Sequence, residues 1–301
     1  MNFSEKIKSK RKEFGMSQEQ LAEKIGVSRQ AITKWETDGG MPDIENILLI
    51  ASLFGTTVDE LLSSEKKLKI GNSFFHESIV EYDIDGKKHY DINIGGAHEI
   101  TLESNDSEKL RVRLASNLIT PIDQLCKIKI DDNKNNIDVD LHRDNELSEA
   151  QTKDSLYVFI SIPAKFILGI ELAAHTNTLK ISNIQTENIE FEGKASRIYL
   201  DNVTGVTELN STVDMTVVCA NAISGMIGIN QLSATSVLHI PKGTEFQLKK
   251  KGLSNRVSYT LDGKKSPTPE YPNAKDMIKI SGLNTELVVN ECTDISREML
   301  Y

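Results

Sequence analysis

The sequence predicts two domains of different class, an α-helical domain over residues 1–63 followed by an all-β domain over residues 76–292. Three observations lead to this prediction. At the start of the chain apolar residues recur three and four positions apart, which is the period of an amphipathic helix. From about Gly71 they alternate, as in a strand, and further along a pattern repeats every 19 residues. We expect a polar linker over 64–75 and a short tail over 293–301.

The predicted helices of the first domain are marked by apolar stripes and by their ends. Ser17 and Gln20 have the spacing of a capping box, in which each side chain satisfies a backbone N–H group of the first turn. Ser28 is a good N-cap for a third helix, and Pro42-Asp43 opens a fourth. The apolar positions that form the stripes are Phe3, Ile7, Phe14, Leu21, Ala22, Ile25, Ile47, Leu48, Ala51 and Phe54.

Charge is distributed unevenly along the chain. The 301 residues carry a net charge of −9. Residues 1–34 nevertheless hold eight Lys and Arg against four acidic residues, whereas residues 35–65 hold seven acidic residues and no Lys or Arg. A surface that contacts phosphate needs local positive charge, and the balance at the start of the chain permits one.

The 19-residue pattern predicts that the β domain is a β-solenoid. Asn183, Asn202 and Asn221 share one phase, and the apolar residues around them keep step. A fixed spacing near 20 residues with short strands is typical of stacked rungs, each of which buries its apolar face on the next. We expect these asparagines to hydrogen-bond along the stack and interpret the column as structural. A ligand site along the same column is the alternative.

Residues Ser17–Glu36, which read SQEQLAEKIGVSRQAITKWE, resemble the phage repressor/Cro-like (XRE) helix-turn-helix family. The likeness extends over most of residues 3–63, including Leu53-Phe54-Gly55. It implies a domain of five helices that binds double-stranded DNA, with the helix over residues 28–36 in the major groove. It therefore predicts a sequence-specific transcription regulator, with repression as the activity typical of the family.

The helix that begins at Ser28 turns Ala31, Ile32 and Trp35 toward its own domain. The side chains expected to face outward are Arg29, Gln30, Thr33 and Lys34. Arginine can donate two hydrogen bonds to guanine, and glutamine can pair with adenine. The resemblance implies that Arg29, Gln30 and Lys34 read bases, with Ser28 and Thr33 beside them. The alternative for each of these residues is a solvated side chain.

Other positions in the first domain have predicted roles that follow from the same resemblance. Gln18, the first residue of the second helix, is expected to bind a phosphate through its side chain and the helix N-terminus. Arg11 and Glu36 match positions that form a partly buried ion pair, so we assign them a structural role. Trp35 is expected to anchor the core. The loop over 37–43 has no basic residue, so binding by one copy would be weak and a homodimer is expected.

The repeating β segment is similar to the adhesin-type β-solenoid domains of bacterial proteins. Function follows from sites and not from a fold, so two roles remain open for this domain. It could mediate oligomerisation or sense an effector or a protein partner for the DNA-binding domain. Alternatively it is the main functional part, a platform that binds a protein or a glycan, with DNA binding secondary.

An enzyme is not predicted. The sequence has no Gly-rich phosphate loop, no HExxH and no GxSxG motif, so we assign no catalytic residue, no metal ligand and no cofactor. Cys126, Cys219 and Cys292 are far apart and form no CxxC pair, which favours free thiols in a reducing compartment. The sequence shows no signal peptide and no apolar run long enough for a bilayer, so we expect a cytoplasmic protein without a membrane partner.

Overall fold

The computed structural model describes residues 3–14, 16–37, 39–54 and 74–297. The chain divides into two compact units, Met1–Ser73 and Phe74–Tyr301, and each is described by itself. Most of the expected linker, the expected fifth helix after Phe54 and the last residues of the tail lie outside the described residues. No helix within the described ranges is long and apolar enough to cross a membrane.

The first unit contains four described helices, α1 (Phe3–Glu13), α2 (Gln18–Ile25), α3 (Arg29–Glu36) and α4 (Ile44–Phe54). The Ser17–Gln20 capping box is present at the start of α2, and Ser28 caps α3. Asp43 caps α4, because its carboxylate accepts the backbone N–H of Asn46 at 2.9 Å. The apolar stripes meet in one core, whose fully buried members are Ile7, Leu21, Ile32 and Ile50.

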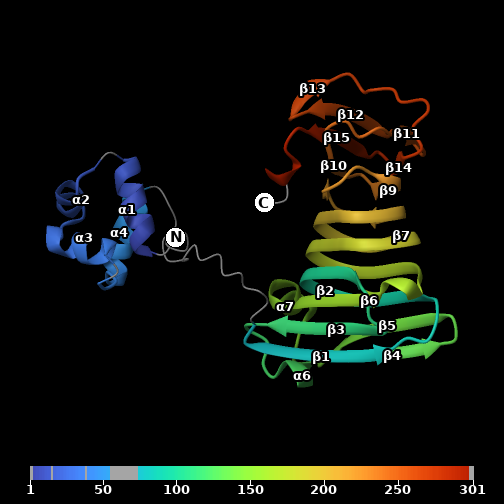
Figure 1. Cartoon of the computed structure of the whole chain (residues 1–301), viewed down its shortest axis with the longest axis horizontal. Coiled ribbons are helices and arrows are strands. Elements are labelled where there is room, and N and C mark those ends of the chain that lie inside the picture. The colour runs from blue at the N-terminus through green and yellow to red at the C-terminus, as the bar shows by residue number, and fades with distance from the viewer. Residues whose placement is uncertain (1–2, 15, 38, 55–73, 298–301) are drawn as a thin grey trace. The chain divides into compact units, whose positions relative to one another are not determined.

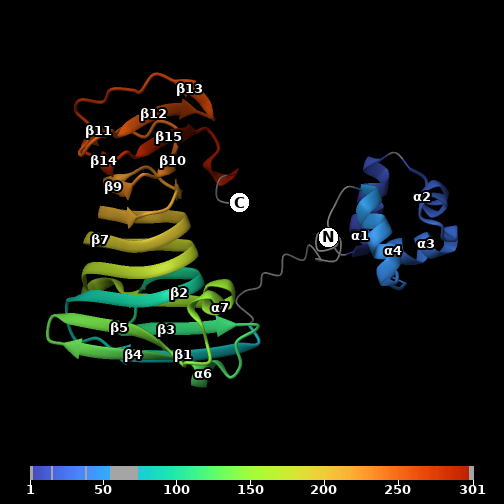
Figure 2. The ribbon, with the colours of Figure 1, turned by 180° about the vertical axis from the view of Figure 1, so that it is seen from behind.

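The second unit is built on one sheet of 15 strands. In Figures 1 and 2 its middle part winds as stacked turns. The first strands are β1 (His76–Asp83), β2 (Lys88–Asn105), β3 (Lys109–Ser116), β4 (Cys126–Asn133), β5 (Asn136–Arg143), β6 (Tyr157–Pro163) and β7 (Ile167–Ser211). The later strands are β8 (Thr216–Cys219), β9 (Ser224–Leu232), β10 (Thr235–Pro241), β11 (Gln247–Lys250), β12 (Arg256–Leu261), β13 (Lys264–Ser266), β14 (Met277–Leu283) and β15 (Glu286–Cys292).

The second unit departs from the uniform repeat that the sequence predicts. It contains two short α-helices, α6 (Ile122–Leu125) and α7 (Glu149–Ser155), and two 3-10 turns, η1 (Ala164–Phe166) and η2 (Ile295–Arg297). Its first strands include antiparallel pairs, β1 with β3, β3 with β6 and β4 with β5. The expectation of 19-residue rungs throughout is therefore wrong for this end of the unit, where hairpins close the sheet.

The remaining strand pairs of the sheet are parallel, apart from β12 with β13. β7 is a single strand of 45 residues, and it pairs in parallel with β2, β8 and β9. Hydrogen-bonded side chains on adjacent turns are 19 residues apart at Asn183 and Asn202, and 20 apart at Glu190 and Asn210. Each turn directs its apolar residues inward, and together they form one continuous buried cluster.

The predicted hydrogen bonding along the asparagine column is confirmed. The Asn202 side chain donates from Nδ2 to Oδ1 of Asn183 at 2.9 Å. Its backbone N–H donates to Oδ1 of Asn221 at 2.9 Å. Asn183 and Asn202 have φ angles of 56° and 53°, in the left-handed region that asparagine tolerates better than most residues. The column therefore stabilises a corner of the stack.

The final turns are stacked out of sequence order. β14 lies between β9 and β11 and pairs in parallel with both. In the same way β15 lies between β10 and β12. The turn formed last in the sequence is therefore inserted between two turns that precede it, and the outermost pair is β12 with the short antiparallel strand β13.

Candidate DNA-binding surface

Helix α3 divides cleanly into a buried side and an exposed side. Ile32, Trp35 and Glu36 are between 0% and 7% exposed. The outward side chains are those of Arg29, Gln30, Thr33 and Lys34, and all four are exposed. The spacing of three and four residues places them on one strip of the helix surface. The structure thus brings together the residues that the sequence selects for base contact.

Two of the smaller side chains at this surface already have intramolecular partners. Ser28 Oγ accepts the backbone N–H of Ala31 at 3.2 Å, so its hydroxyl serves first as the helix cap. Thr33 Oγ1 donates to the carbonyl of Arg29 at 3.1 Å and to Oε1 of Gln18 at 3.2 Å. Ser28 and Thr33 therefore help to fix the helix and its neighbour, while Arg29 and Gln30 supply the long donor groups.

Lys34 packs against a pair of glycines that the sequence analysis did not assign. A Cβ atom placed on Gly40 would lie 2.9 Å from Cε of Lys34, and one placed on Gly39 would lie 3.1 Å from its Cγ. The backbone N–H of Gly39 also donates to the carbonyl of Lys34 at 2.9 Å. The two glycines leave room for the lysine stem along the loop. Their adjacency after a helix is the signal that could have identified them.

Gln18 belongs to a buried polar network that joins three helices. Its Nε2 donates to Oε2 of Glu36 at 2.9 Å. Arg11 binds the same carboxylate with two hydrogen bonds, Nε to Oε1 at 2.6 Å and Nη2 to Oε2 at 2.9 Å. Arg11 Nη1 also donates to the carbonyl of Met16 at 2.8 Å. The ion pair joins α1 to α3, and Gln18 joins α2 to α3.

The network alters the ionisation of both charged partners. Burial alone would raise the pKa of Glu36. The hydrogen bonds from Arg11 and Gln18, together with the positive charge of Arg11, outweigh burial and lower that pKa. The hydrogen bond to Glu36 is the largest influence on Arg11, and it raises the pKa of the guanidinium. Both groups are therefore charged at neutral pH, in a site where their side chains are 11% and 1% exposed.

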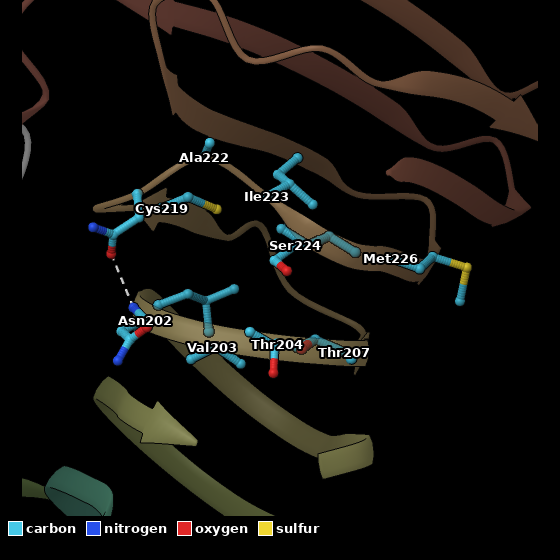
Figure 3. A pocket seen from close by; sticks show the side chains of 13 residues that line it. Asn202, Val203, Thr204, Thr207, Cys219, Ala222, Ile223, Ser224 and Met226 are labelled. Carbon is cyan, nitrogen blue, oxygen red and sulfur yellow. Dashed lines mark hydrogen bonds between the residues drawn. The ribbon is translucent and has the colours of Figure 1, made fainter. Parts of the chain in front are cut away.

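The second unit has a small, partly open cavity beside the asparagine column. Figure 3 shows it between the turn at Asn202 and the segment that leads from Cys219 into β9. Its volume is about 70 Å³, whereas ligand pockets commonly measure about 300–1,000 Å³. Cys219 lines it, and burial raises the pKa of its thiol to about 12. The cavity has room for a few water molecules and not for an organic effector.

A wider hollow of about 300 Å³ lies on the outside of the turns and is strongly acidic. Asp138, Asp91 and Glu171 stand opposite one another on β5, β2 and β7. The other acidic residues of this hollow are Asp140, Glu190 and Glu192. Among the residues that the structure describes, no group of three His, Cys, Asp or Glu side chains is arranged to hold a metal ion.

Comparison with known proteins bears on the first unit. The helix-turn-helix family model HTH_3 matches residues 7–61. The HTH-type transcriptional activator BcrR of Enterococcus faecalis is 42% identical over 73 residues, which are 24% of this chain and 36% of that protein. The cryptic phage CTXphi transcriptional repressor RstR of Vibrio cholerae is 34% identical over 61 residues, which are 20% of this chain and 54% of that protein. The chain thus spans about a third to just over half of these two relatives.

Solved structures match a larger part of the chain than these relatives do, but the similarity is weak. A candidate cell adhesion protein from Clostridium sporogenes matches 72% of this chain and 99% of its own, with a TM-score of 0.38 and 9% identity. A candidate adhesin from Bacteroides fragilis matches 71% and 96%, with a TM-score of 0.31 and 14% identity. Likeness at this level says nothing about what the second unit binds.

The structure and the comparison agree on the fold of the first unit. Its helices α2 and α3 are capped, α3 has an exposed strip, and residues 7–61 match a helix-turn-helix model. The relatives over this region include both an activator and a repressor of transcription. The first unit is therefore a helix-turn-helix domain of the XRE type.

Proposed function

We propose that this chain is a sequence-specific regulator of transcription and that α3 enters the major groove of double-stranded DNA. The observation that carries the proposal is the exposed strip of Arg29, Gln30, Thr33 and Lys34 on a helix whose other side is buried. A helix of this kind fits the major groove, where its N-terminal residues reach the edges of the bases. Arg29 and Gln30 lie in its first turn.

The roles within this surface follow from what each side chain already binds. Arg29 and Gln30 read bases, and Lys34 either reads a base or contacts the backbone beside it. Ser28 and Thr33 flank them and keep the helix in place through their internal hydrogen bonds. The amide of Gln18 is engaged by Glu36 and Thr33, so its contact with phosphate uses the N–H groups of the first turn of α2, which have no acceptor within the helix.

The test begins with the selection of tightly bound duplexes from a random pool by the full chain. Binding of one selected duplex and one scrambled duplex is then measured by fluorescence anisotropy at two salt concentrations. The variant Arg29→Ala/Gln30→Ala removes the proposed base contacts. We expect it to lose the preference for the selected duplex, at about 1–3 kcal/mol for each contact. Affinity for scrambled DNA should change far less.

A charge-matched control separates base reading from general attraction. Lys24 is exposed in the last turn of α2, so Lys24→Ala removes one positive charge without touching α3. It should weaken binding to both duplexes alike and leave the preference intact. The proposal fails if Lys24→Ala and the double variant have the same effect, or if the selection yields no duplex preferred over scrambled DNA.

We propose further that the second unit is a β-solenoid from β2 onward and that it assembles two copies of the chain. The parallel pairing at offsets near 20 residues supports the first statement. The loop after α3 has no basic residue to bind phosphate, which supports the second, because two copies would neutralise more of the DNA backbone. A cytoplasmic, non-enzymatic protein is consistent with regulator relatives. Light scattering that gives a monomer on DNA would overturn the assembly.

A further inference from the structure

A cysteine, a histidine and an asparagine meet in the last turns of the second unit, where Cys292 is 4% exposed. Cys292 Sγ lies 3.6 Å from Nδ1 of His239, across the pair formed by β15 and β10. Nδ2 of Asn290 lies 3.3 Å from the same sulfur and 3.1 Å from Nδ1 of His239. Two nitrogen atoms therefore converge on one thiol.

The orientation of the asparagine amide is set by its other end. Oδ1 of Asn290 accepts a hydrogen bond from Thr260 Oγ1 at 2.7 Å and from the backbone N–H of Gly263 at 2.9 Å. Two donors on one atom identify that atom as oxygen, so the NH₂ group must face the sulfur and the imidazole. Asn290 is 7% exposed, and this amide is held in place by the turn between β12 and β13.

The other two cysteines have different surroundings. Burial raises the pKa of Cys126 to about 11 and that of Cys219 to about 12. Among the described residues neither sulfur has a hydrogen bond to a histidine or an amide side chain, whereas Cys292 has both contacts. The thiolate, not the thiol, is the nucleophile, and Cys292 has beside its sulfur an imidazole that can take up the thiol proton and an amide that can donate to the thiolate.

The chain just after Cys292 is also fixed. The carboxylate of Asp262 accepts the backbone N–H of Thr293 at 2.7 Å and its hydroxyl at 2.8 Å. These hydrogen bonds lower the pKa of Asp262, so it stays ionised at neutral pH. The backbone N–H of Lys242 donates to the carbonyl of Cys292 at 2.9 Å. These hydrogen bonds fix the backbone of Cys292 and Thr293, and with it the position of the sulfur beside His239.

We infer that Cys292 is a peroxide-reactive cysteine, activated by His239 and by the amide of Asn290. The competing acceptor for the thiol proton is the carbonyl of Asn290, also at 3.6 Å. Transfer of the proton to Nδ1 of His239 exchanges the hydrogen bond that Nδ1 accepts from the Asn290 NH₂ group for two donors to the ionised sulfur, the new imidazolium N–H and that NH₂ group.

The reaction needs no reagent other than hydrogen peroxide. The ionised sulfur attacks one oxygen of the peroxide, the S–O bond forms and the O–O bond breaks. The sulfur loses two electrons and the peroxide gains them. The leaving oxygen takes the proton from the His239 imidazolium and departs as water, so His239 returns to its neutral form. The product is a sulfenic acid at Cys292, which a thiol can reduce.

The experiment treats the full chain with dilute hydrogen peroxide and traps sulfenic acid with a cyclic 1,3-diketone probe. Peptide mass spectrometry then gives the rate of labelling at each of the three cysteines. We expect Cys292 to be labelled at least about tenfold faster than Cys219 in the native protein. After unfolding in guanidinium the three cysteines should react alike, which shows that the fold creates the difference.

Two substitutions test the two nitrogen donors. His239→Gln removes the imidazole, and Asn290→Asp keeps both bonds from Thr260 and Gly263 but removes the NH₂ group. Each should slow labelling of Cys292 about tenfold or more. Continued protection of Cys126 and Cys219 in each variant certifies that the fold is retained. Cys292→Ser is the blank for the assay.

The wild-type comparison alone can overturn the inference, since it requires no variant. If native Cys292 is labelled no faster than Cys219, the site is a packing arrangement and not a reactive one. If Cys292 is fast but neither substitution slows it in a folded variant, the activation by His239 and Asn290 is wrong. Fast labelling that both substitutions suppress supports the assignment.

Discussion

Breaking the ion pair between Arg11 and Glu36 should remove most of the stability of the first unit. Arg11→Met deletes two charge-assisted hydrogen bonds and leaves Glu36, whose side chain is 1% exposed, with the hydrogen bond from Gln18 as the one that remains among the described residues. Leaving one member of a buried pair uncompensated costs about 3–5 kcal/mol. A unit of this size has about 3–9 kcal/mol in total, at typical stability per residue.

The assay uses Trp35, the only tryptophan in the chain, which is 7% exposed in the core of this unit. Its fluorescence in a urea titration of the full chain therefore reports unfolding of the first unit separately from the second. We expect Arg11→Met to lower the midpoint strongly with little change in slope. Glu36→Leu should also destabilise, because it leaves Arg11 uncompensated.

The double variant Arg11→Met/Glu36→Leu provides the control. It removes both charges together, so its cost should be smaller than the sum of the two single costs by at least about 1 kcal/mol. A loss below about 1 kcal/mol for Arg11→Met would match an exposed pair and would refute the reasoning. Strict additivity of the two variants would refute it as well.

Two further predictions concern the stability of the first unit at low pH and the substitution of Gly205 in the second unit. Because the pKa of Glu36 is lower in the folded state than its ordinary value of 4.5, its stabilising contribution is complete above that value and is lost as the pH falls through the folded pKa. Trp35 fluorescence should show the unfolding free energy falling as the pH is lowered below 4.5, with a shallower fall in Glu36→Gln; equal slopes would contradict this. At Gly205, where φ is 108°, an added Cβ would lie 1.9 Å from the carbonyl oxygen of Thr186, so Gly205→Ala should lower the thermal midpoint of the second unit in circular dichroism. At Gly243 φ is 83° with nothing within 4 Å, so Gly243→Ala should cost only the backbone strain of about 1–2 kcal/mol, and the two variants must differ for the steric account to stand.

The sequence was informative where structure depends on neighbours along the chain. The caps at Ser17 and Ser28 act within one helical turn, so their spacing alone predicts them. The asparagine column was predictable because a regular repeat turns a distance in sequence into adjacency in space. The packing of Lys34 on Gly39 and Gly40 was missed, since it requires the path of a loop. Pairs that join distant parts of the sequence outside the repeat, such as His239 with Asn290, leave no local pattern at all.

The insertion of β14 and β15 beneath β11 and β12 has a consequence for synthesis on the ribosome. A growing chain can add turn upon turn up to β10 as each one emerges. The next segment, β11 and β12, emerges without the surface on which it finally rests, because that surface belongs to strands made later. It must wait, or settle temporarily on β9 and β10 and then give way. A nascent chain cut short before residue 277 would therefore lack the strands with which β11 and β12 pair, and it would expose their unpaired edges to other chains.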